Sequence, residues 1–94
     1  MTKKAIKANV KGRIQGVGYR ASTHQKATRL GIKGYVKSSS GSEIEVVAEG
    51  EEEKIEELIQ YLQEGPNKAE VEDFSYDWIE PTEDFIRFAI KYEV

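Results

Sequence analysis

Strand-like and helix-like patterns alternate along this chain of 94 residues, and their order restricts the fold that it can adopt. Apolar residues at every second position predict strands, which cover about residues 6–11, 32–37, 43–49, 71–78 and 86–92. Apolar residues at helical spacing predict two helices, over about residues 21–30 and 51–64. The expected order is therefore strand, helix, strand, strand, helix and strand, followed by a short closing strand.

Split strand–helix–strand units in this order build the ferredoxin-like plan. The predicted fold class is α+β: a ferredoxin-like α/β sandwich, β-α-β-β-α-β plus a short closing strand. Its mixed or antiparallel sheet is expected to carry both helices on one face. Residues 1–94 are expected to form a single domain, because a chain of this length holds one modest core.

The second helix has the clearest pattern. Its apolar stripe consists of Ile55, Leu58, Ile59 and Leu62. Glutamates at 51–53 suit the positive end of a helix, and Gly65-Pro66 ends it. The first helix has Thr23, Ala27 and Leu30 on one face. Gly31 is expected to end this helix.

Three local features refine the strands. The phase of the alternation changes between Val71 and Phe74, which predicts a β-bulge. Residues 39–42 predict a turn between two strands of a hairpin, and residues 80–84 predict another turn. Aromatic residues on the last two strands are expected to pack against the core and the sheet.

Composition excludes several classes of protein. There is no cysteine, so disulfides, thiolate metal sites and a cysteine nucleophile are excluded. A structural zinc site is not expected, because His24 is the single histidine and no cysteine is present to complete the ligands. His24 itself is expected on the surface. We expect neither a metal nor a cofactor. No apolar run is long enough to cross a membrane, and no signal peptide is recognisable. The expected location is cytoplasmic.

Charge is distributed asymmetrically along the chain, although the net charge is only −3. Residues 1–37 contain ten Lys or Arg and no acids, whereas residues 38–94 contain all seventeen acids and four basic residues. Most of these charges are expected to pair across the folded domain. The excess of positive charge in the first part still favours an anionic ligand there.

A glycine-rich run lies in that basic part, directly before the first helix. Gly16 and Gly18 permit a curled loop whose N–H groups point inward. The helix start adds further N–H groups, and Arg20 adds a planar guanidinium that suits a phosphate. These features predict a small anion-binding cradle. The alternative interpretation is a plain glycine-rich turn with a solvated Arg20.

The same run resembles the first signature of the acylphosphatase family, Gly-x-Val-Gln-Gly-Val-x-Phe-Arg. Here it reads Gly12-Arg13-Ile14-Gln15-Gly16-Val17-Gly18-Tyr19-Arg20. The similarity continues through Leu30-Gly31-Ile32-Lys33-Gly34-Tyr35-Val36-Lys37, Ala48-Glu49-Gly50, Gly65-Pro66, Ala69-Glu70-Val71 and Phe88-Ala89-Ile90. It covers nearly the whole chain at family-like spacing.

The resemblance implies an acylphosphatase, which hydrolyses an acyl phosphate to a carboxylate and phosphate without a metal or cofactor. Six residues would bind the phosphoryl group: Gln15, Gly16, Val17, Gly18, Tyr19 and Arg20. Arg20 would also act catalytically through its guanidinium. The family's second signature ends in an Asn that orients the attacking water, and Ser38 stands at that position. Ser38 is therefore the second predicted catalytic residue, and reduced activity is expected. Inorganic phosphate would be both product and competitive ligand.

Two other functions remain open at this point. A module that kept the cradle and lost the water site would bind phosphate without catalysis. A nucleic-acid binder of ferredoxin-like shape is less favoured, because Tyr76 and Trp78 lie in the acidic part of the chain.

For the three serines Ser38, Ser39 and Ser40, a plain turn is the simplest interpretation. We expect a monomer.

Overall fold

The structure is a computed structural model that describes residues 2–14, 18–40, 42–66 and 69–91. Its elements, in chain order, are β1 (Lys3–Arg13), α1 (Tyr19–Arg29), β2 (Lys33–Ser40), β3 (Glu43–Glu51), α2 (Glu52–Glu64), β4 (Glu70–Ile79) and β5 (Phe88–Lys91). No helix in these ranges is long and apolar enough to span a membrane.

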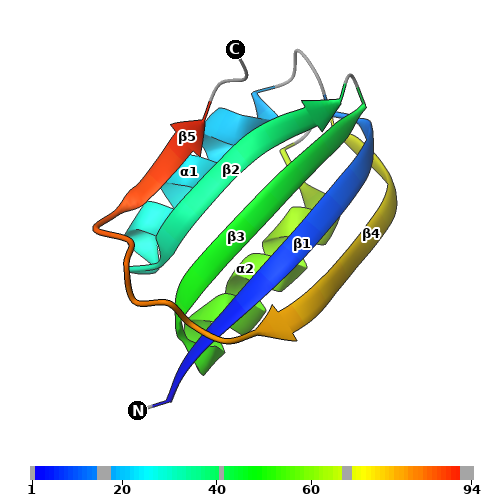
Figure 1. Cartoon of the computed structure of the whole chain (residues 1–94). Helices are drawn as coiled ribbons and strands as arrows, with labels where there is room; N and C mark the ends of the chain where they lie inside the picture. Colours follow the sequence, from blue (N-terminus) through cyan, green and yellow to red (C-terminus); the bar gives the residue numbers. More distant parts are fainter. Residues whose placement is uncertain (1, 15–17, 41, 67–68, 92–94) are drawn as a thin grey trace.

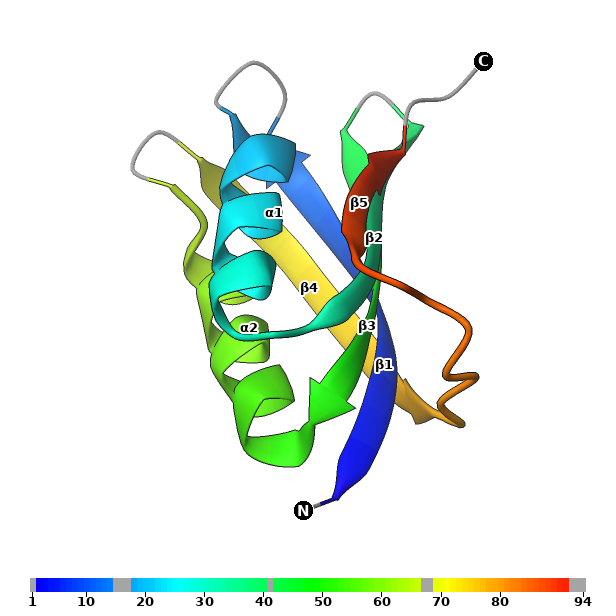
Figure 2. The ribbon, with the colours of Figure 1, turned by 90° about the vertical axis from the view of Figure 1, so that its left-hand side faces the viewer.

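One sheet, with strand order β4-β1-β3-β2-β5, carries both helices on the same face (Figures 1 and 2). The pairs β1–β3, β1–β4 and β2–β3 are antiparallel, and β2–β5 is parallel. The sheet is therefore mixed, and the predicted α+β, ferredoxin-like architecture is confirmed. Because β4 and β5 are the two edge strands, the chain crosses from one edge of the sheet to the other between residues 79 and 88 (Figure 1).

The core lies between the sheet and the helices, and alternation along the strands places it there. Ile6, Ala8 and Val10 of β1 lie opposite Ala48, Val46 and Ile44 of β3, and all six are buried. The stripe predicted on the second helix, Ile55, Leu58, Ile59 and Leu62, is buried against them. Each of the buried valine, leucine and isoleucine side chains contributes roughly 1.5–3 kcal/mol to stability through its burial.

Helix α1 begins at Tyr19, two residues before the predicted start. Gly18 occupies the N-cap with φ 74° and ψ 25°, a left-handed conformation that glycine adopts at low cost. The chain therefore turns into the helix directly after Gly18. Thr23 and Ala27 are buried as predicted, and Gly31 follows the helix with φ 72°.

Two β-bulges interrupt the strand ladders. On β4, Asp73 pairs with Lys11 and Val71 pairs with Gly12, so Glu72 is the extra residue, as the predicted bulge requires. On β2, Ser38 pairs with Ile44 and Ser40 with Glu43, which leaves Ser39 as the extra residue of a second bulge. The turn predicted over residues 39–42 is therefore too long, because β2 continues to Ser40; Gly41 lies outside the described residues.

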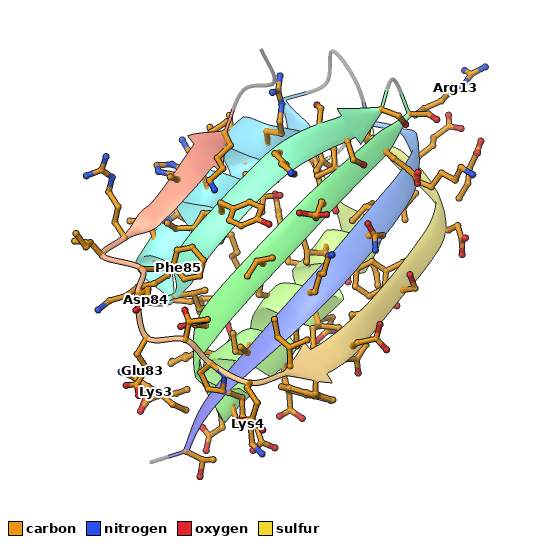
Figure 3. The ribbon with its side chains drawn as sticks, viewed as in Figure 1. Lys3, Lys4, Arg13, Glu83, Asp84 and Phe85 are labelled. Carbon is orange, nitrogen blue, oxygen red and sulfur yellow. The ribbon has the colours of Figure 1, made fainter. Side chains whose placement is uncertain are left out.

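The segment that crosses from β4 to β5 is attached to the sheet by Glu49 of β3. Its buried carboxylate accepts hydrogen bonds from the backbone N–H and the hydroxyl of Thr82, at 2.8 and 3.0 Å. It also accepts one from the backbone N–H of Glu83, at 3.0 Å. Lys3 forms an ion pair with Glu83 at 3.3 Å, and Figure 3 shows both side chains at this end of the sheet.

The last strand is shorter than the alternation predicts. It covers Phe88–Lys91, and Tyr92 lies outside the described residues. Ile86 belongs to the crossing segment instead of the strand, and 86% of its surface is exposed. The alternation of apolar residues continues into the crossing segment, so it predicted a strand that is too long. The crossing segment has no strand partner at Ile86.

The aromatic residues of β4 are less buried than expected. Phe74, Tyr76 and Trp78 share the helix side of the sheet, since they pair with Val10, Ala8 and Ile6. Phe74 is half-buried, but Tyr76 is 39% and Trp78 46% exposed. The ring centroids of Phe74 and Tyr76 lie 5.9 Å apart, and those of Tyr76 and Trp78 lie 6.0 Å apart. Because β4 is an edge strand, these two rings have core neighbours on one side only.

Alkaline pH is expected to destabilise the fold partly through Tyr35. Burial, followed by a 2.7 Å hydrogen bond to Glu45 and the charge of that carboxylate, raises the pKa of Tyr35 from 10.0 to about 12. The unfolded chain therefore releases this proton at lower pH than the folded protein. The contribution of the neutral phenol to the free energy of unfolding is fully present below pH 10 and is lost as the pH rises towards 12.

Urea unfolding at several pH values tests this expectation. Tyr35→Phe should lose less stability than the wild type between pH 10 and 12. Tyr76→Phe, which removes an exposed phenol, is the matched control. Equal pH dependence for Tyr35→Phe and the wild type would contradict the assignment.

Candidate functional site

Half of the predicted cradle lies at the start of α1. Gly18, Tyr19 and Arg20 form the N-cap and first two residues of this helix; Gln15, Gly16 and Val17 lie outside the described residues. The N-cap carbonyl of Gly18 accepts the first helical hydrogen bond, from the N–H of Ser22 at 2.9 Å. The N–H groups of the first turn have no carbonyl within the helix to bind. No acidic side chain occupies this turn, so the positive end of the helix suits an anion.

Arg20 and Ser38 lie at the same end of the molecule. From Tyr19 to Arg29, α1 rises about 15 Å, at 1.5 Å per residue. Strand β2 then runs back, and the five steps from Lys33 to Ser38 span roughly 17 Å. Figure 2 shows the result: β2 ends level with the beginning of α1. Both residues are half-buried, and Ser38 is the last residue before the bulge in β2.

The side chain of Tyr19 anchors this end of α1 to α2. Its ring is buried, and its hydroxyl donates a 2.5 Å hydrogen bond to the carbonyl oxygen of Leu62, in the last turn of α2. Burial, and then the charge of Tyr61, raise the pKa of Tyr19 far above its usual value, so the phenol stays a donor. A second hydrogen bond joins the hydroxyls of Ser22 and Tyr61 between the same helices.

This anchor was not predicted from the sequence. The motif places an aromatic residue directly before Arg20, but it does not indicate what the ring contacts. The contact partner lies 43 residues further along the chain, in a helix whose orientation only the fold supplies. Tyr19 therefore combines two functions: its backbone belongs to the predicted cradle, and its side chain fixes the helix that carries Arg20.

Charge pairing in the fold follows the asymmetry of the sequence. Four ion pairs among the described residues each join a lysine of residues 1–37 to a glutamate of residues 38–94. They are Lys3–Glu83, Lys7–Glu45, Lys26–Glu57 and Lys37–Glu45, at 3.3–4.0 Å. The expectation that the oppositely charged parts pair across the fold is thus confirmed at these positions.

Other candidates for chemistry lie outside this region. Within the described ranges, no three His, Asp or Glu side chains are grouped closely enough to hold a metal ion. His24 was expected on the surface, but its side chain is half-buried and its ring centroid is 6.3 Å from that of Phe88. The packing of β5 against α1 explains this difference. Ser39 and Ser40 are exposed at the end of β2.

The described geometry suits a tetrahedral oxyanion. Backbone N–H groups at a helix start bind such an anion through a positive dipole, and a neighbouring guanidinium adds two parallel hydrogen-bond donors. Ser38 offers one hydroxyl from the adjacent strand end, which can both donate and accept.

Comparisons with known proteins agree with this fold and identify the family. The acylphosphatase family model matches residues 6–90. An acylphosphatase from Dehalococcoides mccartyi is 43% identical over 88 residues, covering 93% of this chain and 97% of the relative. The structure of an acylphosphatase from Coxiella burnetii superposes with a TM-score of 0.89 at 36% identity, over 95% of this chain and 93% of that one. An acylphosphatase from Bacillus subtilis gives the same TM-score at 29% identity, with 95% and 99% covered. The chain belongs to the acylphosphatase family.

Proposed function

We propose that this protein is an acylphosphatase, which converts an acyl phosphate and water to a carboxylate and inorganic phosphate. One observation carries the proposal: Arg20, the last residue of the family signature, lies in the first turn of α1, at the end of the molecule where β2 presents Ser38. Family membership over residues 6–90 and relatives bearing that activity support it.

The reaction places modest demands on the protein. Water attacks phosphorus, the bond between phosphorus and the acyl oxygen breaks, and the electron pair leaves with the carboxylate. A phosphoryl oxygen of the substrate accepts the water proton. Charge is spread over the transferred group, so binding of its oxygens supplies most of the catalysis. The protein must hold that group and place the water.

Individual residues take separate parts in this scheme. The N–H groups of the loop from Gln15 to Arg20 bind the phosphoryl oxygens, and the guanidinium of Arg20 neutralises their charge. Ser38 orients the attacking water through its hydroxyl. Tyr19 keeps α1 in position through its hydrogen bond to Leu62. A serine reaches less far than the asparagine of the family pattern and has fewer donors, so slow turnover is expected.

Phosphate release from benzoyl phosphate tests the proposed activity. Purified protein should hydrolyse this substrate with EDTA present, because backbone dipoles and Arg20 supply the positive charge. The rate above the uncatalysed background is the measurement, and p-nitrophenyl phosphate is a comparison substrate with a poorer leaving group. A strict requirement for added magnesium would contradict the scheme.

Inorganic phosphate is expected to bind at the start of α1. Titration should shift the backbone amide signals of Gly18, Tyr19 and Arg20 in ¹H–¹⁵N NMR spectra. At one hundred times Kd, phosphate should stabilise the native state by about 2.7 kcal/mol and raise Tm accordingly. Sulfate at equal ionic strength should compete. Unchanged amide signals at these three residues would refute the cradle.

A cytoplasmic location and a monomeric state complete the proposal. The absence of cysteine from the sequence suits a reducing compartment. Size-exclusion chromatography with light scattering tests the monomer, and a mass corresponding to two chains would contradict it.

A further inference from the structure

A pocket of about 290 Å³ lies between the C-terminal half of α1 and the start of β5. Its lining includes none of the described residues of the cradle, Gly18, Tyr19 and Arg20. Thr28, which lines it, follows Arg20 by eight residues, so the two positions lie about 12 Å apart along the helix axis. Gly31, Ile32 and Lys33, which follow α1, also line the pocket.

The apolar part of the lining comes from three side chains. Ile32 and Phe88 are only 2% and 3% exposed and contribute the buried surface. Ile86 also lines the pocket, yet 86% of its surface is exposed. An isoleucine this exposed beside a concave apolar surface offers area that an apolar ligand can cover.

The charged side chains of the lining are basic. Lys33 and Arg87 line the pocket, and no Asp or Glu occurs among the described residues that line it. Lys33 and Arg87 are exposed and have long flexible stems, so their charged ends can reach a ligand at the rim. Charge and shape together indicate an anion that carries an apolar body.

The acidic residue opposite Lys33 in the sheet already accepts hydrogen bonds from other groups. Glu49 lies opposite Lys33 in the β2–β3 register, but its carboxylate accepts hydrogen bonds from Thr82 and Glu83. The ion pairs formed by the described residues involve other lysines, such as Lys37, and not Lys33 or Arg87. The positive charge at the pocket is thus available to a ligand.

We propose that this pocket is a second ligand site, which binds a small carboxylate with an aromatic or branched aliphatic body. The apolar body packs against Ile32, Ile86 and Phe88, and the carboxylate faces Lys33 and Arg87. The proposal is independent of the hydrolytic activity, because it depends only on the lining of the pocket.

Benzoate is the probe, followed by ¹H–¹⁵N NMR at constant ionic strength. Saturable shifts are expected at the amides of Gly31, Lys33, Arg87 and Phe88, with a Kd of about 1 mM, typical of a small ligand at an open site. Benzyl alcohol keeps the ring and lacks the charge, so it should bind several-fold more weakly. Inorganic phosphate should shift the amides of residues 18–20 instead.

Three variants and one control separate charge from apolar contact. Lys33→Gln and Arg87→Gln should each weaken benzoate binding about two- to fivefold, as expected for exposed charges. Ile86→Ser should weaken benzoate and benzyl alcohol alike, by about threefold or more. Lys4→Gln removes an exposed lysine elsewhere and should leave Kd unchanged. All four positions are exposed, and each variant's amide spectrum verifies its fold.

Three results would overturn the proposal. The first is benzoate shifts confined to residues 18–20, which would place the carboxylate in the cradle. The second is the absence of any shift at the pocket. The third is equal affinity for benzoate and benzyl alcohol, which would remove charge recognition. Loss of hydrolysis in the benzoyl phosphate assay has no bearing on these readouts.

Discussion

Arg20→Ala is expected to reduce hydrolysis of benzoyl phosphate by at least about 10³-fold and to abolish measurable phosphate binding. Loss of a single oxyanion donor costs about 10²–10³ in kcat, and Arg20 provides two donors together with a full positive charge. Its side chain is half-buried in the first turn of α1, so the charge acts in a partly desolvated position. The expected loss therefore exceeds that of one neutral hydrogen bond.

Two further variants make this experiment decisive. Arg20→Lys should restore little activity, because an ammonium lacks the planar pair of donors that matches phosphate oxygens. Arg13→Ala is the matched control: it removes an arginine of the same motif, at the end of β1, where Figure 3 shows the side chain pointing away from the sheet. Its activity should stay within about twofold of wild type, as for an exposed charge. Full phosphate affinity in Arg20→Ala would show that Arg20 takes no part in binding the anion.

Patterns that span several turns or alternations predicted the fold well. The stripe from Ile55 to Leu62 repeats at the helical period, which a strand cannot satisfy. The change of phase between Val71 and Phe74 predicted a bulge that the register of β1 and β4 confirms. These features depend on neighbours in sequence, so they can be read from the chain itself.

Features that depend on distant partners could not be predicted in the same way. Alternation at Tyr76 and Trp78 indicates a strand but does not distinguish an edge strand from a central one, and that difference decides their exposure. Ser39 and Ser40 have the composition of a turn, yet β3 supplies partners that extend β2 to Ser40. The hydrogen bond from Tyr19 to Leu62 depends on the position of a helix far along the chain.

The candidate site contains features of both kinds, local ones and ones that depend on distant partners. A local motif suffices to predict Gly18, Tyr19 and Arg20 at the start of a helix, and the structure places them there. Whether Ser38 reaches the same region depends on the length of β2 and on its direction relative to α1. Their matching lengths bring it to that end of the molecule, which makes Ser38 the position where the proposed mechanism can be tested most directly.

Ser38→Asn is expected to raise kcat about tenfold or more and to leave phosphate affinity nearly unchanged. The amide reaches further than the hydroxyl and restores the group that the family pattern carries at this position. The cradle does not include this side chain, so binding of inorganic phosphate should be unaffected. A contact that improves only the placement of water acts mainly in the transition state and appears in kcat. Steady-state kinetics with benzoyl phosphate and phosphate titrations provide the two measurements.

Ser40→Asn is the matched control, because Ser40 lies two residues further along the same strand and is exposed beyond the bulge at Ser39. Its kcat should not rise. A rise confined to Ser38→Asn supports an acylphosphatase slowed by one substitution. Unchanged kcat in a folded Ser38→Asn variant would mean that the serine already orients the water as well as an amide does. Absence of hydrolysis in both forms, with phosphate still bound at the start of α1, would refute catalysis and leave a phosphate-binding module, because the cradle and the water site occupy different elements and can be lost separately.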